Sequence, residues 1–498
     1  TSTANISAIS VSDFYTKAEC DSIVLVTNAV QSEKQQVKLT FDNSASGALG
    51  FLNYIELNVP TALKMRGNEL AINNTTYLNS SKNTKFLLAN ANSSTKIWRV
   101  TDGVNIEEMP TSWQNDTLVW VGSNQEAEQY VALNVDTKNW KKPQKVEVVK
   151  NQDLHALRNI DYVIICPEEF VEQATRLAKK HEEVDHITWA VVTDQQVYNE
   201  FSSGTKDFLA IRELARMLYN KYSSEGKAPK NILLFGDGTF DNKNILGMNN
   251  NFIPTYQSIN SIIDAGTSYT TDDPIGYLSP YSKGSIIDTL KIGIGRIPCN
   301  NESEANNFLN KCKRYLSKED LAKGKLGSWR NNITLTADDA DTWGERYFID
   351  NAETIYYEIK ETNPILNVEK IYSDAYKQYA SSSGATYPDA SKAINQRMKK
   401  GCLLFNYVGH GSEDHLSSER LITITDITSW DNYYSLPIVI TSTCEFTRFD
   451  MIDKQSAGEF ILSSENGGGI ALISASRKIP SRNEINTILD HPDIKGIT

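Results

Sequence analysis

The chain contains 498 residues, of which 40% are hydrophobic and 22% are charged, and this is ordinary for a globular protein of roughly two to four domains. Its 50 basic and 62 acidic residues give a formal net charge of −12, and no run rich in lysine or arginine is present. Because such runs are what neutralise phosphates, we do not expect nucleic acid as a partner.

Residues 1–145 carry the pattern of a β-rich domain. Short segments alternate apolar and polar residues, and Asn, Ser, Gly and Asp separate these segments. The segments lie at residues 35–41, 54–59, 96–100, 117–122 and 129–135. This part of the chain is therefore predicted to be an all-β, sandwich-like domain.

From residue 146 onward, apolar strand-like runs alternate with amphipathic helical segments, first over residues 146–325 and again over 326–498. The first unit has strands expected at 161–167, 187–193, 231–238 and 291–298, and helices at 168–183, 209–222 and 304–319. The second has strands expected at 332–339, 368–374, 402–411, 436–446 and 469–476, and helices at 345–361, 391–400 and 456–465. This alternation predicts two α/β subdomains with mainly parallel sheets.

Two chemically reactive residues directly follow predicted strands of the second unit. His410 ends the run CLLFNYV within a Gly-His-Gly turn, and Cys444 ends the run LPIVITST. Parallel sheets place their chemistry at the carboxyl ends of the strands, so these two side chains could face one substrate. An imidazole beside a thiol can remove its proton or stabilise the thiolate, which is the nucleophile.

The same turns could supply an oxyanion hole, because the backbone amides of Gly411 and Cys444 lie where a developing oxyanion would need donors. A structural interpretation stays open at this point. A cysteine that ends an apolar strand is more often an inert buried thiol, and a lone Gly-His-Gly is a weak turn signal. The six cysteines include no CxxC pair, so neither a disulfide scaffold nor a zinc site is predicted.

The stretches LLFNYVGHGSEDHLSSERLIT and LPIVITSTCEFTRFD, together with NILLFGDGTFDNK, YTTDDPIGYL and IGIGRIP upstream, resemble the gingipain family of cysteine peptidases over about residues 145–498. The resemblance implies a caspase-like fold. It implies that Cys444 is the nucleophile and that His410 is the catalytic base or acid. It also places Asp338 where the family carries an acid that orients the histidine. A solvated helix N-cap pair, Asp338 with Asp339, is the alternative.

The pieces TCEFTRFD, SAGE and FGDGTFDN resemble more narrowly the sortase members of this family, which serve the bacterial type IX secretion system. Such proteins remove the C-terminal sorting domain of exported cargo and join the new carboxyl terminus to a lipopolysaccharide amine. They work with an outer-membrane β-barrel partner, so the resemblance implies a location at the bacterial cell surface. Because the chain stops at Thr498, the second α/β subdomain is expected to lack its later strands.

Further expectations concern the acceptor and metal ions. The TRFD segment with Arg448 is expected to help hold the acceptor amine. The aspartates of the FGDG turn at 235–238 and of the TDD run at 271–273 could hold a structural calcium, although turn formation explains them equally well. No cofactor is required by the predicted chemistry. Two alternatives to a sortase are a catalytically silent scaffold with this fold and a plain surface protease.

Overall fold

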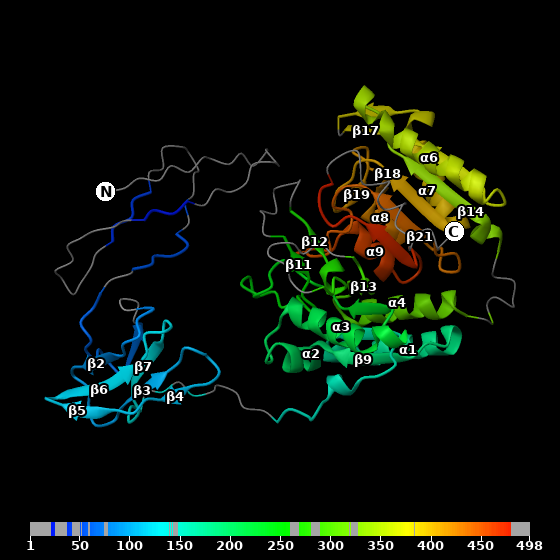
Figure 1. Cartoon of the computed structure of the whole chain (residues 1–498). Helices are drawn as coiled ribbons and strands as arrows, with labels where there is room; N and C mark the ends of the chain where they lie inside the picture. Colours follow the sequence, from blue (N-terminus) through cyan, green and yellow to red (C-terminus); the bar gives the residue numbers. More distant parts are fainter. Residues whose placement is uncertain are drawn as a thin grey trace. The chain divides into compact units, whose positions relative to one another are not determined.

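The computed structural model of the chain describes residues 21–24, 37–41, 50, 52–57, 60–73, 78–138, 140, 142, 148–258, 268–279, 289–317, 319, 327–382 and 384–479. The chain divides into a smaller compact unit, Gln31–Lys150, and a larger one that contains Asn151–Thr498 (Figure 1). No helix within the described residues is long and apolar enough to cross a membrane.

The smaller unit is built from antiparallel strands. They are β1 (Glu69–Asn73), β2 (Thr84–Leu88), β3 (Thr95–Arg99), β4 (Glu107–Glu108), β5 (Ser112–Gln114), β6 (Thr117–Gly122) and β7 (Gln129–Asn134). One sheet has the order β1-β7-β3-β4 and the other has the order β2-β6-β5. The two sheets share one hydrophobic core, in which the rings of Phe86 and Trp120 stack with centroids 4.8 Å apart.

Two expected strands near the start of the chain are not observed. The described residues 37–41 and 54–57 lie outside any strand, and their apolar side chains, Val37 and Ile55 among them, are exposed. The strand prediction from their alternating pattern was therefore wrong for these residues. Alternating residues form a strand only where a partner strand supplies hydrogen bonds and a core covers their apolar side chains. The other residues of these two segments lie outside the described residues.

The first sheet of the larger unit is entirely parallel, as predicted. Its strands are β8 (Tyr162–Cys166), β9 (Trp189–Thr193), β10 (Asn231–Phe235) and β13 (Gly293–Ile297), in the order β13-β10-β8-β9. Its helices are α1 (Val171–Asp185), α2 (Asp194–Phe201), α3 (Phe208–Tyr222) and α4 (Glu302–Tyr315). Two short strands, β11 (Tyr256–Gln257) and β12 (Thr270–Thr271), pair outside this sheet.

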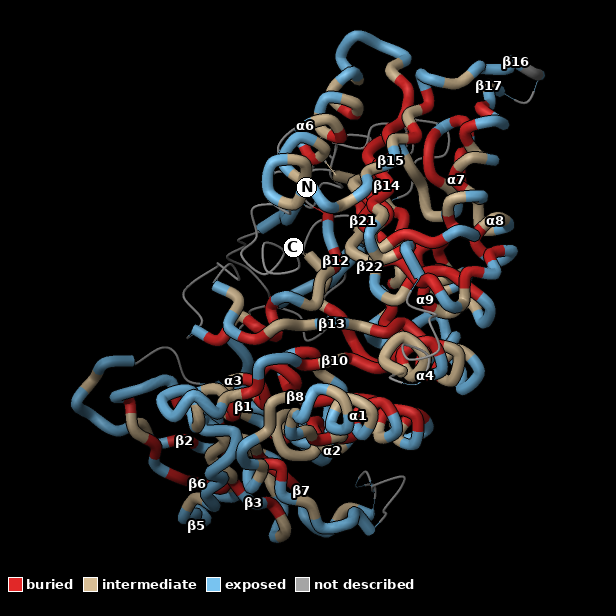
Figure 2. Tube along the Cα trace, turned by 90° about the vertical axis from the view of Figure 1, so that its right-hand side faces the viewer, coloured by how far each residue is buried: buried red, intermediate tan, exposed pale blue. Residues whose placement is uncertain are grey.

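Both faces of this sheet are buried, which explains why its strands read as continuous apolar runs. Val163 and Ile165 of β8 pack with α3, whereas Ile164 and Cys166 pack with α1 and α4. Figure 2 shows the resulting band of buried residues along β8 and β10 between their flanking helices.

The second sheet is also parallel and carries the predicted reactive residues. Its strands are β14 (Asn332–Ala337), β15 (Asn367–Tyr372), β18 (Leu404–Val408), β21 (Ile438–Ser442) and β22 (Ala471–Ser474), in the order β15-β14-β18-β21-β22. Its helices are α6 (Tyr347–Thr362), α7 (Pro388–Lys400), α8 (Ile424–Ser429) and α9 (Ala457–Ser463). Short strand pairs are formed by β16 (Tyr379–Ser381) with β17 (Gly384–Thr386) and by β19 (His415–Leu416) with β20 (Ile422–Thr423).

Capping boxes mark the first residues of two helices in the larger unit, α2 and α9. Thr193 and Gln196 form a capping box that begins α2, a helix not anticipated from the sequence. Ser456 and Glu459 form a second box at the start of α9.

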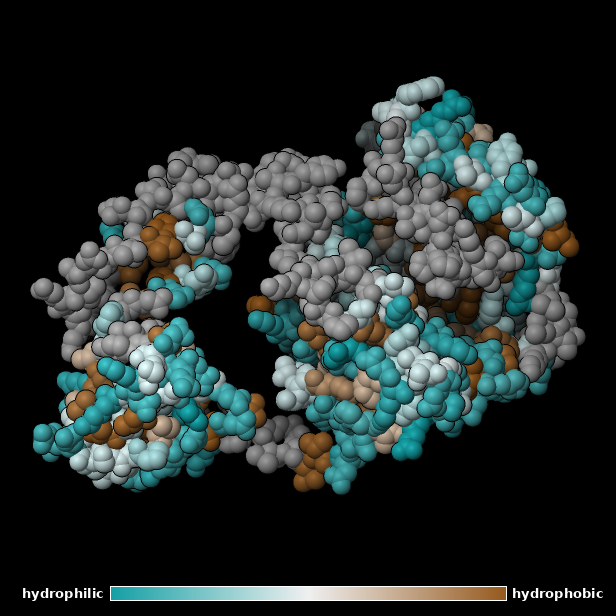
Figure 3. Space-filling view, in the orientation of Figure 1, coloured by the Kyte–Doolittle hydropathy of each residue, from teal (hydrophilic) through white to brown (hydrophobic). Residues whose placement is uncertain are grey.

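The two sheets belong to one packed body. Leu462 of α9 lies in the same core cluster as Ile164 of β8 and Leu309 of α4. Lys311 of α4 is fully buried, and its Nζ donates to the carbonyls of Ile461 and Leu462, each at 2.9 Å. A buried amine therefore ties α4 beside the first sheet to the end of α9 beside the second. On the face of this unit shown in Figure 3, hydrophobic residues appear as separate patches among hydrophilic ones.

Candidate active site

The register of the second sheet brings His410 and Cys444 to neighbouring positions. Strands β18 and β21 pair in parallel, with Val408 opposite Ser442, and the amide of Gly409 donates to the carbonyl of Ser442 at 3.3 Å. His410 and Cys444 each follow this last pair by two residues. Both side chains therefore leave the carboxyl end of the same sheet from adjacent strands, as the strand pattern predicted.

The turns that carry the two residues are packed directly against each other. A Cβ atom built on Gly411 would lie 2.4 Å from Thr443 Oγ1, so only glycine fits at this position without a shift. The backbone that follows His410 thus touches the residue that precedes Cys444. This close approach places the amides of Gly411 and Cys444, the predicted oxyanion donors, on abutting turns.

Cys444 differs from the other described cysteines because its side chain is not buried. The amide of Ile479 donates to its Sγ at 3.4 Å, and Sγ in turn lies 3.9 Å from the carbonyl oxygen of the same residue. The residue after Cys444, Glu445, has a φ of 56°, a conformation that non-glycine residues adopt rarely and that is frequent at functional turns.

The four buried thiols are poor nucleophiles by comparison. Burial raises the pKa of Cys166 and of Cys312 to about 12, and it raises the pKa of Cys402 to about 11. Burial likewise raises the pKa of Cys299 well above its ordinary value. These thiols stay protonated near neutral pH, and the thiolate is the reactive form.

The imidazole of His410 is about half exposed and has two neighbours. Its Nε2 lies 3.1 Å from Oε1 of Glu345, and the ring of Phe348 approaches it edge-on, with centroids 5.2 Å apart. Glu345 belongs to the short 3₁₀ helix η7 (Trp343–Arg346), which precedes α6. The carboxylate beside the ring therefore comes from the loop between β14 and α6.

Asp338 contacts the backbone of His410 and not its ring. The amide of His410 donates to Oδ2 of Asp338 at 2.9 Å, and the hydroxyl of Tyr407 lies 3.1 Å from the same oxygen. Tyr407 also donates to the carbonyl of His410 at 2.7 Å. The resemblance implied that Asp338 contacts the imidazole, but in this structure Glu345 makes that contact. Asp338 instead contacts the backbone of the turn that carries the histidine.

Asp338 belongs to a buried group of carboxylates with Asp339 and Glu419. Burial, with repulsion from Asp339, raises the pKa of Asp338 to about 7, and hydrogen bonds from His410, Ser417 and Tyr407 oppose the rise. Asp339 accepts from the hydroxyl of Tyr387 at 3.0 Å. The pair is therefore buried beneath the site, unlike the solvated N-cap that was the alternative.

Sequence reasoning missed Glu345, although a local signal pointed to its turn. The stretch TWGE has the S/T-x-x-E form of a capping box, and Thr342 and Glu345 make that box. The pattern predicts a helix start. It does not predict that the second carboxylate oxygen reaches a histidine 65 residues later in the chain.

Arg448 lies on the turn after Cys444, but its guanidinium already has a partner. Its Nη1 lies 3.1 Å from Oε1 of Glu445, and the side chain is mostly buried. Burial acts to raise the pKa of Glu413, but hydrogen bonds from the backbone and Lys454, with the charges of Lys454 and Arg448, outweigh it, so the net pKa is lowered. An acceptor group at Arg448 would have to compete with Glu445.

Asp237 of the FGDG turn lies in a buried polar region, where the Asn300 side chain hydrogen-bonds its carboxyl group. It is buried, and repulsion from Asp237 and Glu304 adds to the burial that raises the pKa of Glu459. Glu459 Oε1 and Asn300 Oδ1 are buried without a hydrogen-bond partner. Carboxylate and amide oxygens are the ligand types that calcium takes in proteins. In the TDD run, Asp272 accepts from Arg296 at 2.6 and 2.8 Å, so its charge is paired with that guanidinium.

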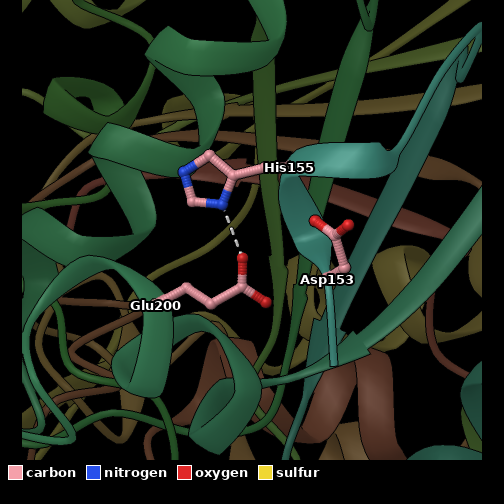
Figure 4. Close-up of side chains that lie close together, drawn as sticks. All are labelled: Asp153, His155 and Glu200. Carbon is pink, nitrogen blue, oxygen red and sulfur yellow. Dashed lines mark hydrogen bonds and ion pairs between the residues drawn. The ribbon is translucent and has the colours of Figure 1, made fainter. Parts of the chain in front are cut away.

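A separate cluster of ionisable side chains, made by Asp153, His155 and Glu200, lies at the start of the larger unit (Figure 4). His155 Nδ1 lies 2.7 Å from Glu200 Oε2, and Asp153 stands nearby. The other oxygen of Glu200 accepts from the amide of Leu154 at 2.7 Å and from Gln152 at 2.9 Å. These contacts tie the 3₁₀ helix η1 (Leu154–Ala156) to α2, which accounts for the group without an ion.

A thiol and an imidazole that follow adjacent parallel strands, on turns that pack against each other, suit the chemistry of a cysteine peptidase. The model of peptidase family C25 matches residues 155–492. The chain therefore belongs to peptidase family C25.

Solved structures of low identity accompany this match. Dimeric latent PorU from Porphyromonas gingivalis is 23% identical, with a TM-score of 0.46, and the match covers 57% of this chain and 30% of that one. The Arg-specific cysteine proteinase gingipain R is 16% identical, with a TM-score of 0.49, over 67% of this chain and 68% of that one. The complex of the pro- and mature domains of RgpB from Porphyromonas gingivalis is 17% identical, with a TM-score of 0.48, over 66% and 69%. The chain thus spans less than a third of the PorU chain that it matches. No curated protein matches.

Proposed function

We propose that the chain is a cysteine transpeptidase in which Cys444 is the nucleophile and His410 is its acid and base. The observation that supports the proposal is the parallel register of β18 and β21, after which a partly exposed thiol and a half-exposed imidazole follow at equivalent positions. Membership of peptidase family C25 supports the peptidase chemistry.

In the first half-reaction, Cys444 Sγ attacks the carbonyl carbon of a substrate peptide bond. His410 takes the thiol proton as Sγ attacks and passes it to the leaving amine as the C–N bond breaks, and a thioester remains on Cys444. The amides of Gly411 and Cys444 would hold the oxyanion of the tetrahedral intermediate. Removal of one such donor costs about 10² to 10³ in kcat in enzymes of this type.

In the second half-reaction, water or an amine attacks the thioester, with His410 accepting the proton of the nucleophile. Water gives a free carboxylate, whereas an amine gives an amide, and both regenerate the thiol. An amine competes against water at roughly 55 M, so it must be held in place, and positioning can supply effective molarities of about 10⁵ M or more. We infer that residues 411–435, which form β19, β20 and α8 rather than a plain loop, and residues 447–450, with Arg448, hold this acceptor.

The substrate and partners follow from the narrower sequence resemblance. We infer that the substrate is a cargo protein with a C-terminal sorting domain, that the acceptor is a lipopolysaccharide amine, and that the protein works at the bacterial cell surface with an outer-membrane β-barrel partner. The likeness of TCEFTRFD and SAGE to the sortase members supports this inference.

The test is incubation of the chain with a peptide from the C-terminal end of such a cargo, with and without a good amine nucleophile, followed by mass spectrometry. We expect cleavage in both samples and amide product at millimolar amine. Cys444→Ala should abolish both products while the chain stays folded, because alanine keeps a small apolar side chain at the strand end. Retained turnover in Cys444→Ala would refute the nucleophile assignment. Carboxylate as the sole product, with a suitable acceptor and the barrel partner present, would make the chain a protease.

We also propose that Asp237, Glu459 and Asn300 hold a structural calcium ion. The unsatisfied, buried oxygens of Glu459 and Asn300 support the proposal. The ion would neutralise carboxylates between α4 and α9 and would take no part in the proton transfers at His410.

A further inference from the structure

The loop between β14 and α6 exposes a large aromatic side chain close to His410. Trp343, the first residue of η7, is 85% exposed. Glu345, two residues further on in the same short helix, lies 3.1 Å from His410 Nε2. Each residue of a 3₁₀ helix advances by about 2.0 Å, so the backbone of Trp343 lies only about 4 Å along the helix axis from the residue that touches the imidazole.

The neighbours of Trp343 in η7 restrain its indole ring. Thr342 and Glu345 form the capping box that starts the helix. Residues three apart in a 3₁₀ helix lie on the same side of it, and the guanidinium carbon of Arg346 accordingly lies over the Trp343 ring, 5.5 Å from its centroid. Because the ring is mostly exposed and the guanidinium lies over one face, the other face is open to a ligand.

The strand order decides which half of a substrate this loop meets. In the second sheet β14, β18 and β21 are consecutive neighbours. Cys444 follows β21, His410 follows β18 and the loop with Trp343 follows β14, so the strand that carries the imidazole lies between the other two. During acylation the carbonyl half of the substrate is bonded to the thiol, whereas the amine half receives its proton from the imidazole. The amine half therefore lies on the side of β14.

We propose that Trp343 is a specificity-determining residue that binds a large apolar side chain on the amine half of the substrate. This inference rests on the proposed function of Cys444 and His410. An exposed indole gains by burying its surface against an apolar side chain, and an aromatic partner adds to that gain. An acidic side chain is the poorer fit, because Arg346 already has a partner in Asp350, with Nε 3.8 Å from Oδ1. An extended chain advances by about 3.5 Å per residue, so the bound side chain belongs to the first few residues after the cleaved bond.

An incidental exposure of Trp343 predicts different behaviour. Single apolar side chains are common on protein surfaces and need no ligand. Removal of such a side chain would weaken neither half of the substrate. In the proposed role, removal of the indole weakens a substrate with a peptide as its amine half, whereas a substrate with a small aryl amine in that place loses little.

The experiment compares two substrates with the same acyl half. One is the cargo peptide, and the other carries a fluorogenic aminocoumarin in place of the amine half, joined at the bond where mass spectrometry shows that the cargo peptide is cleaved. The full chain is compared with Trp343→Ala, Trp343→Phe and a control, Tyr357→Ala. For each protein, kcat and KM on both substrates, the melting temperature and thiol-probe labelling of Cys444 are measured.

The control removes an exposed aromatic ring from the segment that follows η7. Tyr357 is 62% exposed and lies on α6 ten residues beyond the first residue of that helix, so it is about 15 Å along the helix axis from its start.

We expect Trp343→Ala to raise KM for the cargo peptide by about tenfold to a hundredfold, with the loss confined to this substrate and with the melting temperature and thiol labelling unchanged. Trp343→Phe should recover most of the loss, because it keeps an aromatic surface. Tyr357→Ala should match the parent chain in every measurement. Serine placed in turn at the residues of the amine half should reproduce the loss at one position in the parent chain and should have little effect there in Trp343→Ala.

Equal losses on both substrates, or no loss on either, would overturn the proposal and leave the proposed function intact. If the parent chain cleaved no cargo peptide, the proposed function would fail, and titration of that peptide into Cys444→Ala, with and without Trp343→Ala, would decide on Trp343 by itself. Weaker binding by the double variant would support the contact, whereas equal affinities or an absence of binding would refute it.

Discussion

Gly411→Ala tests whether the turns of His410 and Cys444 act as one unit. The added Cβ would lie 2.4 Å from Thr443 Oγ1, 3.1 Å from its Cγ2 and 3.3 Å from its Cβ. Ordinary contacts of a Cβ begin at about 3.4 Å, so one turn must move by about 1 Å relative to the other.

The size of the effect follows from this displacement. Overpacking of a buried site costs about 1 to 3 kcal/mol of stability, and a misplacement of 1 Å at a reacting centre costs about 10² in rate. We therefore expect kcat/KM to fall about a hundredfold and the free energy of unfolding to fall by about 1 to 3 kcal/mol. The control is Gly295→Ala on β13, where the nearest atom, Leu233 Cδ1, is 3.8 Å from the added Cβ.

The assay is a double-mutant cycle with Thr443→Ala, read by peptide cleavage and by denaturant unfolding. Thr443→Ala removes the two closest atoms, and it removes a buried hydroxyl that has no hydrogen-bond partner. The double variant should recover most of the activity lost in Gly411→Ala, with a coupling energy of about 1 to 3 kcal/mol. Additive effects of the two substitutions, or full activity of Gly411→Ala, would refute the packing argument.

Four further predictions concern thiol reactivity, the acceptor site, the pH dependence of stability and metal binding. An electrophilic thiol probe at neutral pH should label the parent chain at Cys444 and leave Cys166, Cys299, Cys312 and Cys402 unlabelled, since burial raises the pKa of those four thiols; mass spectrometry of the digested chain would expose labelling elsewhere. Arg448→Ala should reduce the yield of amide more than it reduces cleavage, and equal losses would remove Arg448 from the acceptor site. The pKa of Asp338 is raised to about 7 in the folded chain, whereas its ordinary value is 3.8. Between about pH 4 and 7 the folded chain therefore keeps a proton on Asp338 that the unfolded chain releases. This group makes the free energy of unfolding fall as the pH rises through that range. Asp338→Asn should flatten that fall by up to about 1.4 kcal/mol per pH unit, and parallel unfolding curves of the two proteins would show the assignment to be wrong. Calcium should raise the melting temperature of the parent chain and not that of Asp237→Asn, and an equal rise in both would place the ion elsewhere.

The architecture of the larger unit could be predicted because its signals are local and agree with one another. Runs such as YVIIC and LLFNYV are long enough for a strand, too short for a helix and buried on both faces, so they read as parallel strands. Helix α2 was missed because its eight residues follow β9 directly, with Thr193 serving as both the last strand residue and the cap. The segments 37–41 and 54–57 show the converse error, since alternation was present without a pairing partner among the described residues.

Only those site residues that directly follow a strand could be located from the sequence. The positions of His410 and Cys444 after adjacent strands follow from the two apolar runs, whereas the catalytic roles proposed for them rest on the family resemblance. The role of Asp338 could not be resolved in this way, because strand-end position places its carboxylate near the turn but does not decide between the amide and the ring of His410. The position of Glu345 depends on the path of the loop after β14, and no periodicity of the sequence predicts that path.

The buried amine of Lys311 has a consequence for any attempt to divide the larger unit. Its three carbonyl partners, those of Ile461, Leu462 and Gly469, all come from the second half of the unit, while the lysine itself belongs to α4. A fragment that ended before residue 326 would leave an ammonium group in an apolar surface, and the complementary fragment would leave a helix end without its donor. Neither half is thus a self-sufficient module, and the two sheets are expected to unfold in a single cooperative step rather than one after the other.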